Sequence, residues 1–213
     1  MKKYKVIFLD WNGTLSSSKF WGHLEDPKHP KNHIFLAIEK SLFGNFRHLI
    51  SPWMRGEKTS EEMVKLISDD AGLNYDLAFK EFVKGCKKMK FVSNKVPKIV
   101  HEYRKHGIKM VIATDNMDSF SRWTVPALKL DKMFDDILDS SSLKKLKNDF
   151  EPDGSNFFFT NYLKKNGIKP DESIIIDDSD DKEGKIQKYG IDYLKIESHT
   201  GLMPAFDKLA TLV

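Results

Sequence analysis

The chain of 213 residues has the length of one ordinary domain, or of a core with a smaller inserted module. Its hydrophobic content of 40% and charged content of 31% are typical of a soluble globular protein and exclude a disordered one. The net charge of +4 arises from many lysines that are nearly balanced by acids, so we expect a solvated lysine-rich surface and no nucleic-acid partner.

Cysteine content and apolar runs indicate the cellular setting. Cys86 is the single cysteine, which excludes an intrachain disulfide. The longest apolar run near the start is too short for a signal-peptide core, and no stretch approaches the ~20 apolar residues needed to span a bilayer. We therefore expect a cytoplasmic protein without membrane contact, either a monomer or a weak dimer.

The first element is a short strand that ends at a carboxylate. Four apolar residues, Val6 to Leu9, predict a strand buried on both faces, and Asp10 follows directly. Open α/β sheets bind ligands at the carboxyl ends of their strands, and Gly13 permits a tight turn that leaves Asp10 uncovered. The segment Asp10-Trp11-Asn12-Gly13-Thr14 therefore predicts a site.

Between Lys31 and Lys90 the pattern is helical. A first, largely buried helix is predicted from Ile34, Leu36, Ala37, Ile38, Leu42 and Phe43. Thr59-Ser60-Glu61-Glu62 is typical of a capped start, and Gly72 of a helix end. A third helix is expected from about Tyr75 to Lys88, with Leu77, Phe79, Phe82 and Val83 inward. We predict a small all-helical module at residues 17–92, inserted into a core formed by residues 1–16 and 93–213.

From Val96 the pattern alternates between helix and strand. A helix is expected from Pro97 to His106, and then a strand from Lys109 to Ala113 that ends in Thr114-Asp115-Asn116. Later strands are expected near Phe134 to Leu138, Ser173 to Ile176 and Tyr193 to Ile196. Helices are expected at about 119–129, 157–166, 185–189 and 203–209. Asp153 or Ser155 is expected to cap the helix at 157–166. This alternation predicts a Rossmann-like three-layer α/β/α core with a mostly parallel sheet.

The strand that begins at Ser173 ends in four acids within five residues, Asp177-Asp178-Ser179-Asp180-Asp181. Such carboxylates repel one another unless a cation lies between them. Oxygen ligands suit Mg²⁺, so this strand end predicts a magnesium site.

These segments together resemble the haloacid dehalogenase-like (HAD) superfamily, whose phosphatases usually carry Asp-x-Asp-Gly-Thr after the first strand. The resemblance implies that residues 17–92 form a cap over the catalytic face and that Asp10 is a nucleophile that forms an aspartyl-phosphate. It further implies that Thr114 binds a phosphoryl oxygen, with Gly13, Asp115 and Asn116 beside the substrate. The implied metal ligands are Asp10, the backbone carbonyl of Asn12 and Asp178, with Asp177 adjacent and Asp181 as a further candidate.

The family's third motif is a lysine that neutralises charge at the phosphate. Counting forward from Ser140 leads to Lys147, and counting back from Pro152-Asp153 leads to Glu151. We choose Lys147 because a carboxylate would repel the phosphate, with Lys144 and Lys145 as alternatives. In the helical module, Arg55 or Lys58 is a candidate for contact with an anionic substrate, and ordinary surface charge is the alternative.

One position departs from the family pattern. Asn12 stands where phosphatases carry the general acid and base, and an amide cannot deliver a proton. The leading expectation is a Mg²⁺-dependent phosphatase for a small phosphorylated metabolite. The alternative is a catalytically impaired HAD-like protein that binds a phosphorylated ligand or a protein partner. Cleavage of a carbon–halogen or carbon–phosphorus bond is less favoured, because dehalogenases need no metal and no lysine of the module stands out for a Schiff base.

Overall fold

A five-stranded parallel sheet forms the centre of the protein. The computed structural model describes residues 4–210. The strands are β1 (Val6–Leu9), β2 (Lys109–Thr114), β3 (Asp136–Asp139), β4 (Ser173–Asp177) and β5 (Asp192–Lys195), in the spatial order β3-β2-β1-β4-β5. Every neighbouring pair is parallel, so the carboxyl ends of the strands meet along a single edge. The predicted α/β fold is confirmed.

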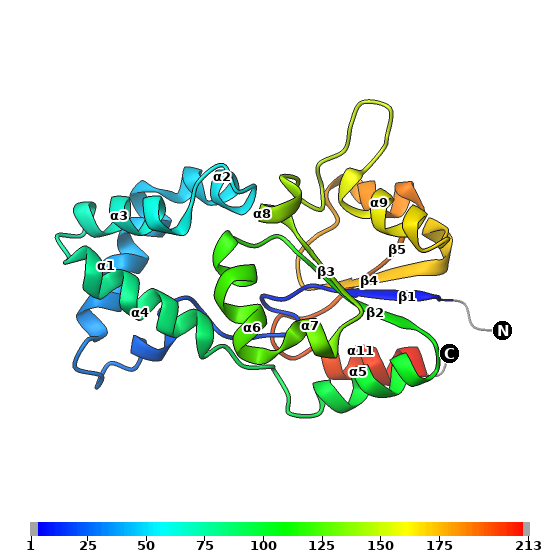
Figure 1. The fold of residues 1–213 in the computed structure, drawn as a ribbon, viewed down its shortest axis with the longest axis horizontal. Helices are drawn as coiled ribbons and strands as arrows, with labels where there is room; N and C mark the ends of the chain where they lie inside the picture. The colour runs from blue at the N-terminus through cyan, green and yellow to red at the C-terminus, as the bar shows by residue number, and fades with distance from the viewer. Residues whose placement is uncertain (1–3, 211–213) are drawn as a thin grey trace.

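Helices cover both faces of this sheet, as Figure 1 shows. Side chains alternate along β1, so that Ile7 and Leu9 enter one apolar cluster while Val6 and Phe8 enter the other. The first cluster includes side chains of α5 (Val96–Lys105) and α11 (Leu202–Ala210). The second includes side chains of α9 (Phe157–Lys165) and α10 (Lys185–Tyr189). The three layers follow from strands that are buried on both faces.

Residues 17–92, which we call the helical module, pack around an apolar cluster of their own. Its main helices are α1 (Asn32–Lys40), α2 (Ile50–Met54), α3 (Ser60–Asp70) and α4 (Tyr75–Lys87). Their cluster contains Trp21, Trp53 and Phe82, and Met117 of the sheet domain joins it. In Figure 1 the module stands beyond the carboxyl ends of the strands. It is therefore placed to face whatever binds at that edge.

Short elements complete the chain. They are the helices α6 (Val125–Leu128), α7 (Leu130–Met133) and α8 (Ser140–Leu143), and the single turns at Gly22–Leu24, Ser41–Asn45, Arg47–Leu49, Phe120–Thr124, Pro170–Glu172 and Lys182–Gly184. No helix within residues 4–210 has the length and apolarity that crossing a membrane requires.

Local sequence signals account for the module's best-defined helix. Thr59 accepts a hydrogen bond from the backbone N–H of Glu62, and the Glu62 carboxylate accepts one from the Thr59 N–H. This reciprocal capping box starts α3 at the expected place. Gly72, with φ of +63°, lies just after the helix ends at Asp70.

Several predicted details are wrong. Leu36, Phe43 and Leu77, all expected to point inward, are exposed. Leu36 lies on the opposite side of α1 from the buried residues Ile34 and Ile38, because successive residues of a helix turn by about 100°.

The start of α9 also differs from the prediction. Asn156, and neither Asp153 nor Ser155, caps this helix by accepting a hydrogen bond from the Phe159 N–H at 3.1 Å. The Asp153 carboxylate instead accepts from the N–H of Ser155 within the preceding turn.

Candidate active site

The carboxyl ends of the three central strands bring distant residues together. Asp10 follows β1, Thr114 ends β2 and Asp177 ends β4, and β1 lies between the other two. Parallel pairing in matched register places these strand ends side by side. Asp10 and Asp177 are both almost completely buried. The structure thus assembles a polar, water-poor site at one edge of the sheet.

Lys147 connects two of these carboxylates. Its ammonium group donates to Asp10 Oδ1 at 2.8 Å and to Asp177 Oδ2 at 2.5 Å. The backbone of Lys147 is held as well, because its N–H donates to Asp115 at 2.9 Å and its carbonyl accepts from the Asn156 amide at 2.7 Å. The side chain is therefore fixed in position before any ligand arrives.

The other two candidate lysines lie elsewhere. The Lys144 ammonium donates to the carbonyl of Gly56 at 2.9 Å, and the Lys145 ammonium pairs with Glu151 at 2.9 Å. Both lysines are exposed or half-exposed. Of the three, only Lys147 contacts Asp10.

Burial and mutual charge shift the proton affinities of this cluster. Burial raises the pKa of Asp10 to about 7, against the opposing effect of the Lys147 ammonium. Burial alone would also raise the pKa of Asp177, but Lys147 and hydrogen bonds from Ser179 outweigh it and lower that pKa. The pKa of Lys147 is raised well above its ordinary value, because the carboxylates around it outweigh the cost of burying its charge.

Three carboxylates can hold a metal ion here. Asp10, Asp177 and Asp178 each offer one oxygen, and these oxygens lie within 4.8 Å of one another. Gly13 has φ of +80°, and a Cβ atom at this position would lie only 2.1 Å from Asp178 Oδ2. Glycine is thus required for Asp178 to approach the loop after β1. An all-oxygen donor set of this kind suits a hard divalent cation.

Asp181 is not part of this set. Its carboxylate accepts from the backbone N–H groups of Ile186 and Gln187, both at 3.0 Å, at the start of α10. It thereby satisfies two N–H groups in the first turn of this helix, which lack partners inside the helix.

Two buried polar groups beside the carboxylates have no hydrogen-bond partner within the described residues. They are the hydroxyl of Thr114 and the side-chain amide nitrogen of Asn116. Leaving a buried donor unpaired costs free energy, so such groups are commonly satisfied by a ligand or water. Both are donors, and they lie at the end of β2 and just after it. They can therefore receive an anion.

A cavity of about 340 Å³ opens between this edge and the helical module. Asn12 and Gly13 line it from the sheet, and residues of the module line it from the other side. His199, which sequence reasoning missed, also lines this cavity, and its backbone N–H donates to the Gly13 carbonyl at 2.6 Å. The signal available in the sequence was its position in the loop that follows β5, at the same edge of the sheet.

Arg55 contacts the sheet domain by another route. Its guanidinium forms two hydrogen bonds with the Asp149 carboxylate, at 2.9 and 2.7 Å. Asp149 lies two residues after Lys147, so this pair connects the module to the segment that carries the buried ammonium. Lys58 is exposed.

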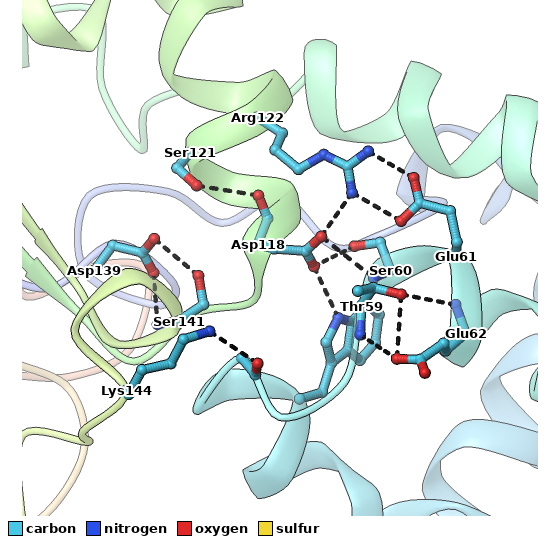
Figure 2. A network of polar contacts seen from close by, with 12 residues as sticks. Thr59, Ser60, Glu61, Glu62, Asp118, Ser121, Arg122, Asp139, Ser141 and Lys144 are labelled. Carbon is cyan, nitrogen blue, oxygen red and sulfur yellow. Dashed lines mark hydrogen bonds and ion pairs between the residues drawn. The ribbon is translucent and has the colours of Figure 1, made fainter.

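Asp118 is the centre of a second connection, which Figure 2 shows. Its carboxylate accepts hydrogen bonds from the indole of Trp53 at 3.1 Å and from the hydroxyl of Ser60 at 2.6 Å, both in the module. It also pairs with Arg122 at 2.7 Å, and Arg122 in turn pairs with Glu61 of the module. Asp118 follows β2 by four residues, so the network fixes the module against the loop that follows Thr114 and carries Asn116.

The chain is similar to one described protein family. The family model for haloacid dehalogenase-like hydrolases matches residues 50–196. No curated protein matches the chain.

Solved structures resemble the fold along most of its length. A predicted HAD-like family hydrolase from Porphyromonas gingivalis is 15% identical with a TM-score of 0.68, over 98% of each chain. A HAD family enzyme from Bacteroides thetaiotaomicron, solved with magnesium and inorganic phosphate, is 16% identical with a TM-score of 0.64, over 92% of this chain and 95% of that one. L-2-haloacid dehalogenase from Xanthobacter autotrophicus is 12% identical with a TM-score of 0.62, over 91% of this chain and 77% of that one.

Proposed function

Since the chain belongs to the haloacid dehalogenase-like hydrolase family, we propose that it is a Mg²⁺-dependent phosphatase that acts on a small phosphorylated metabolite through Asp10. The observation that carries this proposal is the cluster of Asp10, Asp177 and Asp178 around the ammonium of Lys147. It combines a buried nucleophile, a fixed cation and a set of metal ligands, and Asn12 and Gly13, which follow this nucleophile in the same loop, line the neighbouring cavity.

In the proposed reaction, a carboxylate oxygen of Asp10 attacks the phosphorus in line with the leaving oxygen. The bond from phosphorus to that oxygen breaks, an aspartyl-phosphate forms, and the leaving group departs with the bonding electrons and takes a proton from solvent water, because Asn12 supplies none. Lys147 and the unpaired hydroxyl of Thr114 stabilise the charge on the equatorial oxygens. Water then attacks the phosphorus, releases inorganic phosphate and regenerates the Asp10 carboxylate.

Asp10 has to be ionised for this attack. Burial works against ionisation and raises its pKa to about 7, while Lys147 favours it. Lys147 therefore has two roles in the proposal: it holds Asp10 as a carboxylate, and it stabilises the negative charge on the phosphoryl oxygens during transfer to Asp10.

The metal would be held by Asp10, the backbone carbonyl of Asn12 and Asp178, with Asp177 adjacent. When bound, Mg²⁺ supplies positive charge next to the phosphoryl oxygens. Magnesium rather than another divalent ion is proposed by likeness to the enzyme from Bacteroides thetaiotaomicron, which was solved with magnesium and inorganic phosphate. That complex also supports phosphate over halide as the anion.

Asn116 is proposed to bind the phosphate, and the cavity that Gly13 lines is of a size for a small molecule. The backbone N–H of Gly13 donates to the Ser16 carbonyl at 2.8 Å, so the proposed part of Gly13 is to leave room beside Asp178. Asp115 contributes indirectly, because its carboxylate holds the backbone N–H of Lys147. Arg55 is paired with Asp149, so its proposed part is to position the loop that carries Lys147.

The test is phosphate release from para-nitrophenyl phosphate and a panel of metabolite phosphates, with and without Mg²⁺. We expect turnover that needs both Mg²⁺ and Asp10, so Asp10→Asn should release no phosphate while it keeps the native circular dichroism spectrum. Activity that survives in Asp10→Asn would overturn the nucleophile assignment.

Asn12 favours a second function, the capture of a phosphorylated ligand without efficient turnover. Loss of a positioned acid and base typically slows hydrolysis by ~10²–10⁴-fold. Acyl and aryl phosphates, whose leaving groups need little protonation, should be affected least. If Asn12→Asp speeds hydrolysis of alkyl phosphates more than that of para-nitrophenyl phosphate, the native chain is a phosphatase whose rate is limited by the missing proton donor. Binding of inorganic phosphate with no turnover in either protein would favour the binding function.

A further inference from the structure

The cavity between the sheet and the helical module has mostly apolar walls on the module side. Leu42, Phe43 and Ile50 line it there, and Met117 lines it from the sheet domain. Phe43 is 52% exposed, although an aromatic side chain of this size is usually covered. The wall therefore offers apolar surface that a ligand would bury.

Beside Lys19, Glu39 is the single carboxylate among the described residues that line this cavity. It lies on the last turn of α1, it lines the same cavity, and it is half-buried. Within the described residues, no hydrogen bond or ion pair reaches this carboxylate. Burial raises its pKa, with the charge of Lys19 acting against that shift. Lys19 itself is held at 2.5 Å by Glu25.

The three charged groups do not balance. Lys19, Glu25 and Glu39 carry one positive and two negative charges, and the ion pair between Lys19 and Glu25 uses the only cation among them. A half-buried carboxylate without a partner is costly, and a cation brought by a ligand removes that cost.

We propose that Glu39 determines specificity by binding a positively charged nitrogen in the leaving group of the substrate. The phosphate end lies at Asp10, the ammonium end lies at Glu39, and an apolar segment between them packs against Leu42 and Phe43. This inference rests on the proposed function and names its substrate class, an amine-bearing phosphomonoester.

The test uses phosphonates, whose carbon–phosphorus bond is not the ester bond that the proposed reaction breaks. We would titrate the native chain, in Mg²⁺, with aminoalkyl phosphonates of increasing length and with alkyl phosphonates of equal carbon number. At the length that spans from Asp10 to Glu39, the amine should bind about tenfold more tightly than its alkyl counterpart, and added salt should weaken that preference.

Three variants complete the design. In Glu39→Gln, the ratio of the two dissociation constants should approach one. Glu39→Asp keeps the charge on a shorter side chain, so the preference should persist and move to a longer amine. Glu102→Gln changes an exposed carboxylate on α5 that does not line this cavity, and it should keep the native ratio.

A preference that is absent at every length, or that survives in Glu39→Gln, would overturn the assignment of Glu39. Phosphate release from para-nitrophenyl phosphate separates the two proposals. If release occurs without an amine preference, only the role of Glu39 fails. If no ester is hydrolysed and no phosphonate binds, both proposals fail.

Discussion

The buried charge of Lys147 contributes both to the stability of the folded chain and to the proposed activity. Its ammonium is hydrogen-bonded to two buried carboxylates, Asp10 and Asp177. We predict that Lys147→Met lowers the free energy of unfolding by roughly 3 to 5 kcal/mol without metal, because both carboxylates then lose their partner. Phosphatase activity should fall at least a hundredfold. Thermal unfolding without Mg²⁺ and a para-nitrophenyl phosphate assay measure the two effects.

Lys145→Met is the matched control for this change. Lys145 pairs with Glu151 near the surface, two residues away along the chain. Exposed pairs contribute little to stability, so this variant should unfold and react like the native chain. Equal losses in the two variants would mean that the charge of Lys147 has no special part in the site.

The contact between the helical module and the sheet domain is a property of whole elements. Asp118 accepts hydrogen bonds from the buried Trp53 and from Ser60, and it pairs with Arg122 (Figure 2). We predict that Asp118→Ala destabilises this contact by about 1 to 3 kcal/mol, because buried donors of the module are left unpaired. Hydrogen exchange should then quicken in α2 and in the first turn of α3, while β1 and β4 stay protected.

Asp69→Ala removes an acid of the same module whose carboxylate, within residues 4–210, forms only an exposed pair with Lys65. It should leave exchange in α2 unchanged. If Asp118→Ala also leaves it unchanged, the network in Figure 2 does not hold the module in place.

Glu81 makes the stability of the module depend on pH. Burial alone would raise its pKa, but hydrogen bonds from His23, Lys31 and Lys84 outweigh it and hold the pKa at about 2, against an ordinary value of 4.5. The folded chain therefore binds this proton less readily than the unfolded chain. The resulting stabilisation, on the order of 3 kcal/mol, is complete above pH 4.5 and is lost as the pH falls toward 2.

Urea unfolding of the native chain and of Glu81→Gln measures this effect. The native chain should be clearly more stable at about pH 7, and the difference should shrink at about pH 3. Asp76→Asn, at an exposed position of the same helix, should show no such pattern. A difference that stays constant with pH would contradict the account of Glu81.

For the molecule as a whole, the sheet was predictable because each central strand is a run of buried apolar residues that stops at a polar one. The observed β1 has the predicted bounds, and β4 extends one residue further, to Asp177. The boundaries of the domain core and of the helical module remain predictions. The same strand ends led to Asp10 and to the acids at 177–181 as candidates, since parallel strands end at a common edge. Thr114, and Asp178 as the metal ligand among those acids, were implied by the family resemblance.

The segment around Lys147 was harder to predict, because counting residues from neighbouring motifs gives conflicting positions where the loop between them has changed length. The two counts, to Lys147 and to Glu151, differ by four residues. In the structure, the Glu151 N–H donates to the carbonyl of Ser155, and Gly154 takes φ of +80° in this turn. The loop absorbs the extra residues between α8 and α9, where Figure 1 draws it standing out from the sheet.

Other features have no local signal at all. The apolar pattern of α1 does not distinguish a side chain that faces the core from one, like Phe43 just beyond it, that lines a cavity. The contact of His199 with Gly13 joins segments that are 186 positions apart, and only the folded chain brings them together. The burial of Glu81 depends in the same way on hydrogen bonds from three separate positions.

The central claim is that Asp10 forms a covalent bond to phosphorus. The most direct measurement is to stop the native chain with acid during turnover of para-nitrophenyl phosphate in Mg²⁺ and to locate any phosphoryl group by peptide mass spectrometry. We predict a phosphoryl group on Asp10 that appears during turnover, disappears as substrate is exhausted and is absent from Asp10→Asn. Phosphate release with no modification of Asp10, or with a phosphoryl group on another residue, would contradict the account.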